Sequence, residues 1–242
     1  MPRRPHSLRP RAALAIAAAA LTAAAGFGVD AALAAHKTIS RSQASAVATA
    51  VNLRHSDLPT LKQQANPITP AERQSSAAVD ACIGESSPSQ ALADIQSPDF
   101  VGPSPTQLTV NSETQILPSA GVVASDLAAI RRPHALICLR DALGKALVTT
   151  APKGSTFSVS VARLPATLPG TDGVAAVRVT AIFHVKSGST TVTVPAYVDD
   201  VGFAYGQAEV ALDVVSTTAP PSSSLETRLA VLLVARARAA IG

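Results

Sequence analysis

The sequence predicts a single α+β domain that follows a signal peptide, with an antiparallel meander sheet covered by helices. Three observations support this. Helical periodicity dominates the first half of the chain after the leader. Four segments of alternating apolar and polar residues then follow in the second half, and an amphipathic segment closes the chain. Helical and strand patterns that are grouped rather than interleaved are typical of α+β domains.

The first 35 residues have the three parts of a secretory signal peptide. The first eleven positions carry four arginines and no acidic residue, an apolar run covers residues 12–25, and small alanines occupy positions 32, 34 and 35. The run could be extended into a membrane anchor, but it is rich in weakly apolar alanine and is followed by Asp30, which favours cleavage. We therefore expect release outside the cytoplasmic membrane without a stable membrane anchor, by general or twin-arginine export.

The composition excludes several classes of function. Only 3% of the residues are aromatic and tryptophan is absent, which argues against a stacking platform for carbohydrate or single-stranded nucleic acid. The net charge of +4 comes mainly from the leader, because removing its four arginines and Asp30 leaves 16 basic and 15 acidic residues. Without a concentrated basic stripe, we expect no nucleic-acid partner.

Two cysteines, Cys82 and Cys138, lie in the exported part. An isolated pair in an oxidising compartment predicts one disulfide, and closing a loop of this length stabilises the fold by about 4 kcal/mol in the chain-entropy model. Two buried free thiols, or a metal or redox site, are the alternatives. No C-x-x-C spacing or histidine cluster in the sequence supports a metal site.

The helical part of the pattern has clear boundaries. Residues 36–68 read as an N-terminal arm whose first part, 36–50, has weak structure, and residues 69–242 as the domain. Helices are predicted over 69–84, 118–132 and 134–150, with one strand over 102–117 between the first two. A last helix within 220–242 begins at a capping box of Ser223 and Glu226, and its apolar stripe should cover the sheet.

The second half predicts four consecutive antiparallel strands with one solvent-exposed face. The segments are 155–165, 173–188, 189–200 and 207–216. Between the last two, Asp199 to Gln207 are expected to form the connection, with Gly202 and Gly206 allowing the chain to reverse. This connection also carries the candidate contact residues, which are Tyr197, Asp199, Asp200 and Tyr205.

Motifs for catalysis or metal binding are weak. The sequence has no G-x-S-x-G nucleophile motif and no glycine-rich phosphate loop. His55, Ser56 and Asp57 are adjacent, but adjacent residues in one short loop cannot form a catalytic relay. The histidines show no i, i+4 pairing with each other, and the Asp199-Asp200 pair lacks the further oxygen ligands of a calcium loop. We expect no catalytic residues, no metal and no cofactor.

Two C-terminal stretches resemble a known family. The segments "YVDDVGFAYGQAEVAL" and "LETRLAVLLVARARA" are similar to the ends of exported actinobacterial domains of the PsbP-like α+β type. Those domains end in a strand pair of D-x-x-x-F-x-x-G-x-x-E/D-x-x-L character and a helix with E-x-R-L and A-R-A. The resemblance covers residues 197–239. It implies an exported α+β fold without catalytic residues.

These observations predict an exported, non-enzymatic domain at the cell envelope that binds a protein partner or a small apolar ligand. The ligand is expected in a groove between the terminal helix and the sheet. A secreted hydrolase with an unrecognised site, or a purely structural or assembly protein, are the alternatives. A closed Val/Leu core favours interaction, whereas a pocket with converging Asp, His and Ser side chains favours catalysis.

Overall fold

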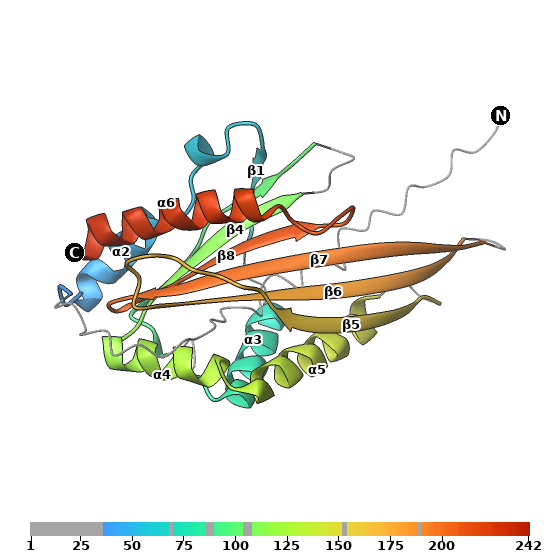
Figure 1. Ribbon diagram of the computed structural model, residues 1–242, viewed down its shortest axis with the longest axis horizontal. Helices are drawn as coiled ribbons and strands as arrows, with labels where there is room; N and C mark the ends of the chain where they lie inside the picture. The colour runs from blue at the N-terminus through green and yellow to red at the C-terminus, as the bar shows by residue number, and fades with distance from the viewer. Residues whose placement is uncertain (1–35, 68–69, 86–89, 104–107, 152–153, 188–189) are drawn as a thin grey trace.

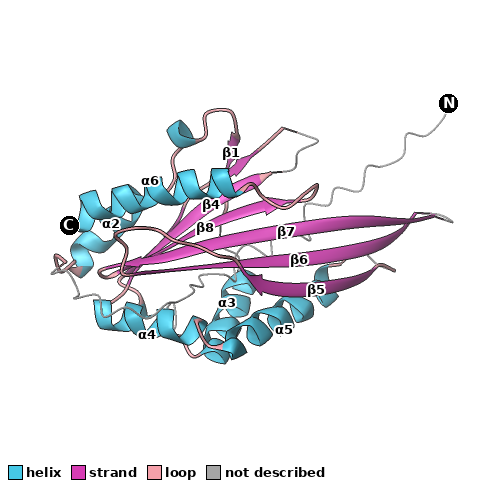
Figure 2. Ribbon diagram, viewed as in Figure 1, coloured by secondary structure: helices cyan, strands magenta, loops and turns pink. Residues whose placement is uncertain are grey.

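The computed structural model describes residues 36–67, 70–85, 90–103, 108–151, 154–187 and 190–242, so the expected signal peptide lies outside the described residues. Within them the chain forms one α+β domain (Figures 1 and 2). The elements are α2 (Arg41–Val51), the 3-10 turn η2 (His55–Asp57), β1 (Lys62–Gln64), α3 (Pro70–Ile83), β2 (Ala93–Gln96), β3 (Asp99–Val101), β4 (Thr109–Ile116), α4 (Ala120–Ile130), α5 (Pro133–Thr150), β5 (Thr156–Arg163), β6 (Gly173–Ser187), β7 (Thr190–Tyr205), β8 (Ala208–Ser216) and α6 (Ser223–Ile241).

The strands form one eight-stranded antiparallel sheet. Its order is β1-β3-β4-β8-β7-β6-β5, and β2 pairs with β4 beside β3. The predicted meander of four strands is confirmed as β5 to β8. The strand predicted before the meander is β4, and it pairs with β8 over its full length. The short strands β1, β2 and β3 were not predicted, because each has only three or four residues and shows no alternation.

Helices lie on both faces of the sheet (Figure 2). In Figure 1, α2 and α6 lie above the sheet, and α3, α4 and α5 lie below it. One buried cluster joins α2 and α6 to the sheet, and a second joins it to α3, α4 and α5. The expectation of one solvent-exposed face is therefore wrong for the centre of the sheet, where consecutive residues of β7 and β8 are buried on opposite sides.

Residues 36–50 also differ from the expectation, because they contain α2. The side chain of Gln43 accepts a hydrogen bond from the Ser40 N–H at 3.1 Å, which satisfies one of the donors left open at a helix start. Ala44, Ala48 and Val51 form the buried side of the helix. Small alanines give a weak amphipathic pattern in sequence, which is why periodicity did not identify α2.

The C-terminal helix α6 lies on the sheet as predicted. Leu229, Leu233 and Ile241 are fully buried against it. The predicted capping box is wrong. The N-cap residue is Ser222, it makes no side-chain capping bond, and the Glu226 side chain turns instead toward Asp199 on the sheet. The Glu226 carboxyl group therefore bonds to the sheet, although the local sequence motif predicts that it bonds to the backbone at the start of the helix.

A polar network joins α6 to the N-terminal part of the domain. The Arg236 guanidinium donates to both carboxylate oxygens of Asp57 at 2.7 Å and to the Asn52 carbonyl at 2.8 Å. Asn52 in turn donates to the Ile95 carbonyl at 2.6 Å and accepts from the hydroxyls of Ser112 and Thr114. The end of α2, the strands β2 and β4, and α6 are therefore held in one arrangement.

The connection between β7 and β8 is much shorter than expected. The strand β7 continues through Asp199 and Asp200 to Tyr205, and only Gly206 and Gln207 form the turn. Asp199 and Asp200 are fully buried rather than solvated turn residues. Gly206 has a φ of +57°, which favours glycine in a two-residue hairpin turn. The expected connection over residues 199–207 is therefore wrong.

Gln207 fastens this turn to two other segments. Its side-chain oxygen accepts from the Ile39 N–H at 2.6 Å. Its side-chain nitrogen donates to the carbonyls of Leu117 and Pro118 at 2.9 and 3.1 Å. The residue is buried, so it connects the start of α2, the hairpin and the β4–α4 loop in the interior.

The disulfide prediction is confirmed. Cys82 in the last turn of α3 is bonded to Cys138 in α5, with a Cα–Cα distance of 5.8 Å. The packing of α3 against α5 is thus covalently fixed.

Replacing both cysteines with serine should lower the free energy of unfolding by about 2–4 kcal/mol, because the unfolded chain regains loop entropy. Urea unfolding of the variant and of the oxidised wild type measures this difference. Equal midpoints and slopes for the two proteins would contradict it.

The Gln207→Ala variant should be destabilised by about 1–3 kcal/mol, since it leaves the Ile39 N–H and the Leu117 carbonyl without their buried partner. Thermal unfolding followed by circular dichroism measures the effect. Gln43→Ala, which removes an exposed hydrogen bond at the start of α2, is the matched control and should cost less. A smaller loss for Gln207→Ala than for the control would show that Gln207 does not fasten the turn.

Candidate functional site

The four candidate contact residues lie on opposite faces of the sheet. Val201 and Phe203 of β7 belong to the cluster under α6, and Val198 and Ala204 to the cluster facing α3, α4 and α5. Because successive side chains of a strand alternate between faces, Tyr197, Asp199 and Tyr205 lie on the α6 side, whereas Asp200 lies on the other. Asp199 and Asp200 are adjacent in sequence but do not form one site.

Asp199 is part of an ion pair. The Arg178 side chain of β6 donates to both of its carboxylate oxygens, with 2.6 Å between Nε and Oδ1. Glu226 of α6 hydrogen-bonds to Asp199, and its pKa is raised to about 8 by burial first and then by the bond to Asp199 and the charge of Asp199. At neutral pH, Glu226 is therefore mainly protonated, and the Arg178 guanidinium supplies the positive charge beside this carboxyl pair.

Tyr205 belongs to a separate group at the end of β7. Its ring lies edge-on to that of His36, with the ring centroids 4.4 Å apart. The His36 Nε2 lies 3.0 Å from a carboxylate oxygen of Asp172, and Asp172 accepts from the Gly206 N–H at 2.6 Å. This group holds the start of the described chain to the hairpin turn, so its contacts are structural.

Asp200 lies with other acidic residues on the opposite side of the sheet. The β7–β8 register pairs it directly with Asp213, and the β8–β4 register pairs Asp213 with Asn111. A parallel row joins Glu209, Gln115 and Asp94 across β8, β4 and β2. Since strands are spaced at about 4.8 Å, the four strands β7, β8, β4 and β2 span about 14 Å.

Nine acidic residues lie around these rows on the side of the sheet that α3 and α4 cover, and we call this group the acidic face. The sheet contributes six of them, α3 and α4 contribute one each, and Glu85 follows two residues after the end of α3. The members are Asp80, Glu85, Asp94, Asp99, Glu113, Asp126, Asp200, Glu209 and Asp213. They are nine of the fifteen acidic residues that follow residue 35. The nearly neutral net charge thus conceals a strongly segregated charge distribution.

The middle of the acidic face has small side chains. Gly202 and Ala211 are cross-strand partners between the row of Asp200 and Asp213 and the row of Glu209. Glu113 follows next to Ala211 on β4. No large apolar side chain separates the two rows at β7 and β8, so their acidic groups share one environment.

Several buried oxygen atoms on the acidic face accept no hydrogen bond from the described residues. They are Oδ1 of Asp213, Oδ1 of Asn111 and Oε1 of Gln96. The Asp213 and Asn111 side chains are only 2% and 1% exposed. The Asn111 amide nitrogen donates to Asp99 at 3.2 Å, whereas its amide oxygen has no donor in the described structure. These three oxygens are acceptors, and a donor or a cation would satisfy them.

Burial and mutual repulsion raise the pKa values of this cluster. Burial, followed by the charges of Asp126 and Asp94, raises the pKa of Asp80 to about 7. Burial and the charges of Asp126 and Asp80 raise the pKa of Glu209 to about 8. The pKa values of Glu85, Glu113 and Asp213 are raised in the same way, by burial first and then by neighbouring carboxyl groups.

Basic side chains do not offset these shifts. The charged neighbours that shift the pKa values of these five acids are all carboxyl groups. The five are Asp80, Glu85, Glu113, Glu209 and Asp213. In the described part of the chain, none of these five acids takes part in an ion pair. The carboxyl groups of the acidic face can therefore bind protons, or they can bind a cationic ligand.

The spacing of the carboxylates bears on which cation fits. Among the described residues, ligand atoms of three metal-binding side chains come within 4.8 Å of one another only at Cys82, His134 and Cys138. The carboxylates are spread more widely than the ligands of one small metal ion. The acidic face is better matched to an elongated organic cation whose amino or guanidinium groups contact several acids.

The other sequence candidates have structural roles. Burial tends to raise the pKa of Asp57, but the hydrogen bonds from Arg236 and Arg54 and their charges hold it below its ordinary value. His184 is exposed on β6, and its Nδ1 lies 3.1 Å from the Thr193 hydroxyl. His55, Ser56 and Asp57 form the turn η2. No relay joins the three in the described structure.

Only Asp200 of the acidic face was a candidate contact residue. The others were overlooked because Glu209 and Asp213 alternate with the apolar residues Val210, Leu212 and Val214, which indicates an ordinary amphipathic strand. The alternation was identified correctly, but the polar side was taken to face solvent. The register with β4 and the helices on that side bring these acids together, and neither can be read from one strand.

Comparisons with known proteins give little further information. No family model matches the chain, and no curated protein matches it. Among solved structures, the chain is similar to the extracellular domain of PknH from Mycobacterium tuberculosis, with 12% sequence identity and a TM-score of 0.40. The alignment covers 84% of this chain and 99% of that domain. A TM-score this low does not establish a common fold, so the resemblance to PsbP-like domains stays a prediction.

Stability should fall as the pH rises from 5 to 8. An acid whose pKa is raised in the folded state stabilises the fold fully below its unfolded pKa, and this contribution is lost as the pH rises through the folded value. Glu209 alone should contribute a loss of about 3 kcal/mol over this range. Urea unfolding at several pH values measures the slope.

The Glu209→Gln variant, which cannot ionise, should lose less stability between pH 5 and 8. Asp141→Asn, on the exposed surface of α5 beside Arg140, is the matched control and should follow the wild type. A wild-type stability that is constant or increases over this range would contradict the assignment of raised pKa values.

Proposed function

We propose that this protein is an exported, non-enzymatic domain that binds a positively charged organic ligand at the acidic face. The observation that carries this proposal is the Asp213 carboxylate, which is buried within a group of acids and has an oxygen without a hydrogen-bond donor. Burying a carboxylate without a donor or a counter-charge is costly. A bound cation would supply the missing counter-charge and so offset this free-energy cost. Ligand binding should therefore also stabilise the fold.

The chemistry of the acidic face supports amino or guanidinium groups as the ligand. Ammonium and guanidinium groups carry several donors and no acceptor, and the unsatisfied atoms of Asp213, Asn111 and Gln96 are all acceptors. Two or more such groups on one flexible chain can contact acids distributed over about 14 Å of sheet. A polyamine has this charge and this length.

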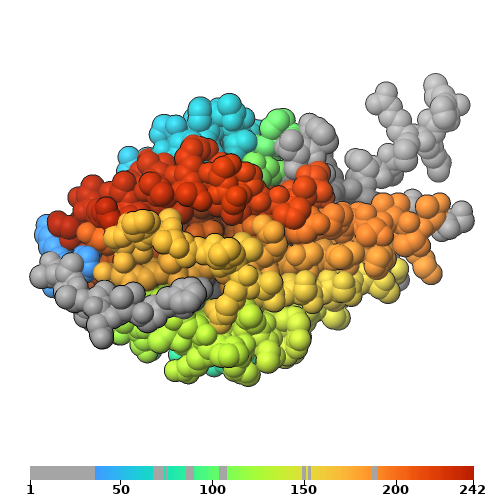
Figure 3. All heavy atoms as spheres, viewed as in Figure 1, coloured from blue at the N-terminus to red at the C-terminus, as the bar shows by residue number. Residues whose placement is uncertain are grey.

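The α6 side of the sheet is a less favourable binding site. The space between α6 and the sheet, where we expected an apolar ligand, is occupied by Leu229, Leu233 and Ile241, and by Leu168 from the β5–β6 connection. Figure 3 shows the atoms of α6 lying directly against those of the β5–β6 connection. The apolar side chains in this contact are already packed against one another, whereas buried oxygen atoms of the acidic face have no hydrogen-bond donor among the described residues.

Export is supported by the disulfide, since such bonds persist in oxidising compartments. Among the described residues, no helix is both long and apolar enough to cross a membrane.

Isothermal titration calorimetry with spermidine, on the chain from residue 36 at pH 7.5 and low salt, tests the proposal. We expect saturable binding that weakens as salt is added, because salt screens the charges. It should also weaken as the pH falls toward 5, because the cation must displace protons from these carboxyl groups, and that displacement becomes less favourable at lower pH.

The double variant Asp200→Asn/Asp213→Asn should bind spermidine at least about 30-fold more weakly, the effect expected when buried charge partners are lost. Asp141→Asn, the exposed control, should bind as the wild type does. Circular dichroism establishes that both variants are folded. The absence of saturable binding to the wild type, or equal affinity of the double variant, would refute the proposal.

A further inference from the structure

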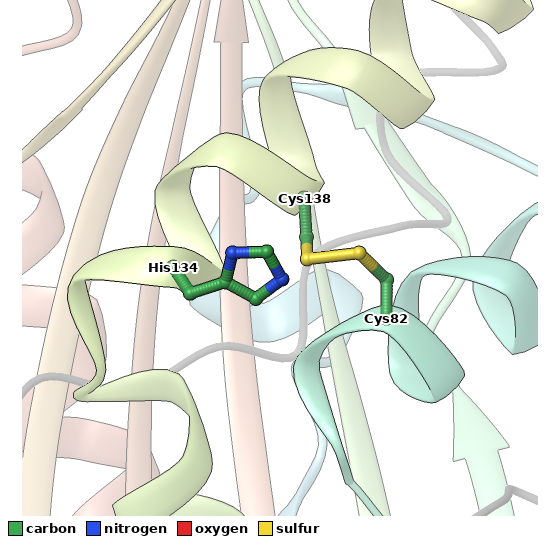
Figure 4. Close-up of side chains that lie close together, drawn as sticks. All are labelled: Cys82, His134 and Cys138. Atoms are coloured by element: carbon green, nitrogen blue, oxygen red, sulfur yellow. A yellow bond between two sulfur atoms is a disulfide. The ribbon is translucent and has the colours of Figure 1, made fainter.

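The disulfide has a neighbour that the sequence pattern did not reveal. His134 and Cys138 are four residues apart on α5, so their side chains lie on one face of the helix. Cys82 reaches the same place from the last turn of α3. Figure 4 shows the imidazole ring of His134 beside the bonded sulfur atoms. One imidazole nitrogen and both sulfurs lie within 4.8 Å of one another.

These three side chains are a common ligand set for zinc. Thiolate sulfur and imidazole nitrogen bind Zn²⁺ in tetrahedral sites, and sites with three protein ligands keep the fourth position for water or another molecule. His134 and Cys82 are exposed, whereas Cys138 is buried. A metal ion could therefore enter from solvent on the side of His134 and Cys82, with Cys138 as the inner ligand.

We propose that reduction of the Cys82–Cys138 disulfide converts this position into a Cys2His site for a zinc-class divalent metal ion. The inference rests on the helix geometry and is independent of the proposed binding of cations at the acidic face. The oxidised protein has a covalent link between α3 and α5, and the reduced protein has a metal link at the same place.

The conversion has two balanced steps. A dithiol reductant transfers two electrons and two protons to the disulfide, giving two thiols, and itself becomes a disulfide. The metal ion then binds both sulfurs and displaces the two thiol protons to solvent, while His134 binds through the lone pair of its neutral ring. The sulfur–sulfur bond must break first, because bonded sulfurs are not thiolates.

The metal link would preserve the position of α3. The described contacts of α3 are mainly with α5, so the disulfide is the strongest restraint on this helix. Asp80 of the acidic face lies only two residues before Cys82. Metal binding would therefore hold the helix that supplies Asp80 under conditions that break the disulfide.

Titration with Co²⁺, a spectroscopic substitute for Zn²⁺, tests the proposal. The chain from residue 36 is reduced under nitrogen with a phosphine, which adds no competing thiol. We expect one Co²⁺ per chain, with the thiolate-to-cobalt charge-transfer band and the visible bands of tetrahedral cobalt, and displacement by Zn²⁺. The oxidised protein should show none of these bands.

Two variants separate this site from nonspecific binding. His134→Ala should bind Co²⁺ at least about 100-fold more weakly, because losing a ligand should cost at least as much as losing an outer-shell partner of a ligand, which weakens binding about 10–100-fold. His184→Ala, which removes an exposed histidine on β6, should bind as the wild type does.

Three results would overturn the proposal. They are the absence of charge-transfer bands in the reduced wild type, equal affinity of His134→Ala and the wild type, and loss of the far-ultraviolet circular dichroism of the fold on reduction in the presence of Zn²⁺. In the last case the metal would be binding to an unfolded chain.

Discussion

The pairing of β7 with β8 is the constraint on which the rest of the structure depends. Because β7 continues without a break through Asp199 and Asp200, these two side chains must point to opposite faces. Because the turn has only two residues, the register then places Asp213 opposite Asp200 and Glu209 opposite Ala204. A slip of one residue would move every one of these side chains to the other face.

The two faces of the sheet differ in how their buried acidic groups are neutralised. On the α6 side, Arg178 and a protonated Glu226 surround Asp199, so this charge is compensated within the domain. On the other side, acids from the sheet and from α3 and α4 share one region, and the five whose pKa values are raised form no ion pair with a basic side chain among the residues that the structure describes. The first arrangement stabilises the docking of α6. On the α3 and α4 side, the negative charge of the acids must be neutralised by protons or by a ligand.

The errors of the sequence analysis have identifiable physical causes. Residues 199–207 contain two aspartates and two glycines, which locally favour a turn, but pairing of β7 with both β6 and β8 overrides that preference. The helix α2 was missed because it packs with alanines, whose apolar pattern is weak. The capping box at Ser223 and Glu226 failed because the Glu226 carboxyl group gains a partner on the sheet. In each case a tertiary contact outweighed a local signal.

The sequence by itself determined the α+β class, the four-strand meander, the helices α3 to α6 and the disulfide. These follow from periodicity, from helix boundaries and from the rarity of cysteine, all of which are local or compositional properties. Only the tertiary structure decided that the acidic residues of β2, β4, β7 and β8 meet on one face, and that His134 lies beside the disulfide. Both depend on register and on helix packing, which join residues far apart in the chain and leave no periodic trace within any one segment.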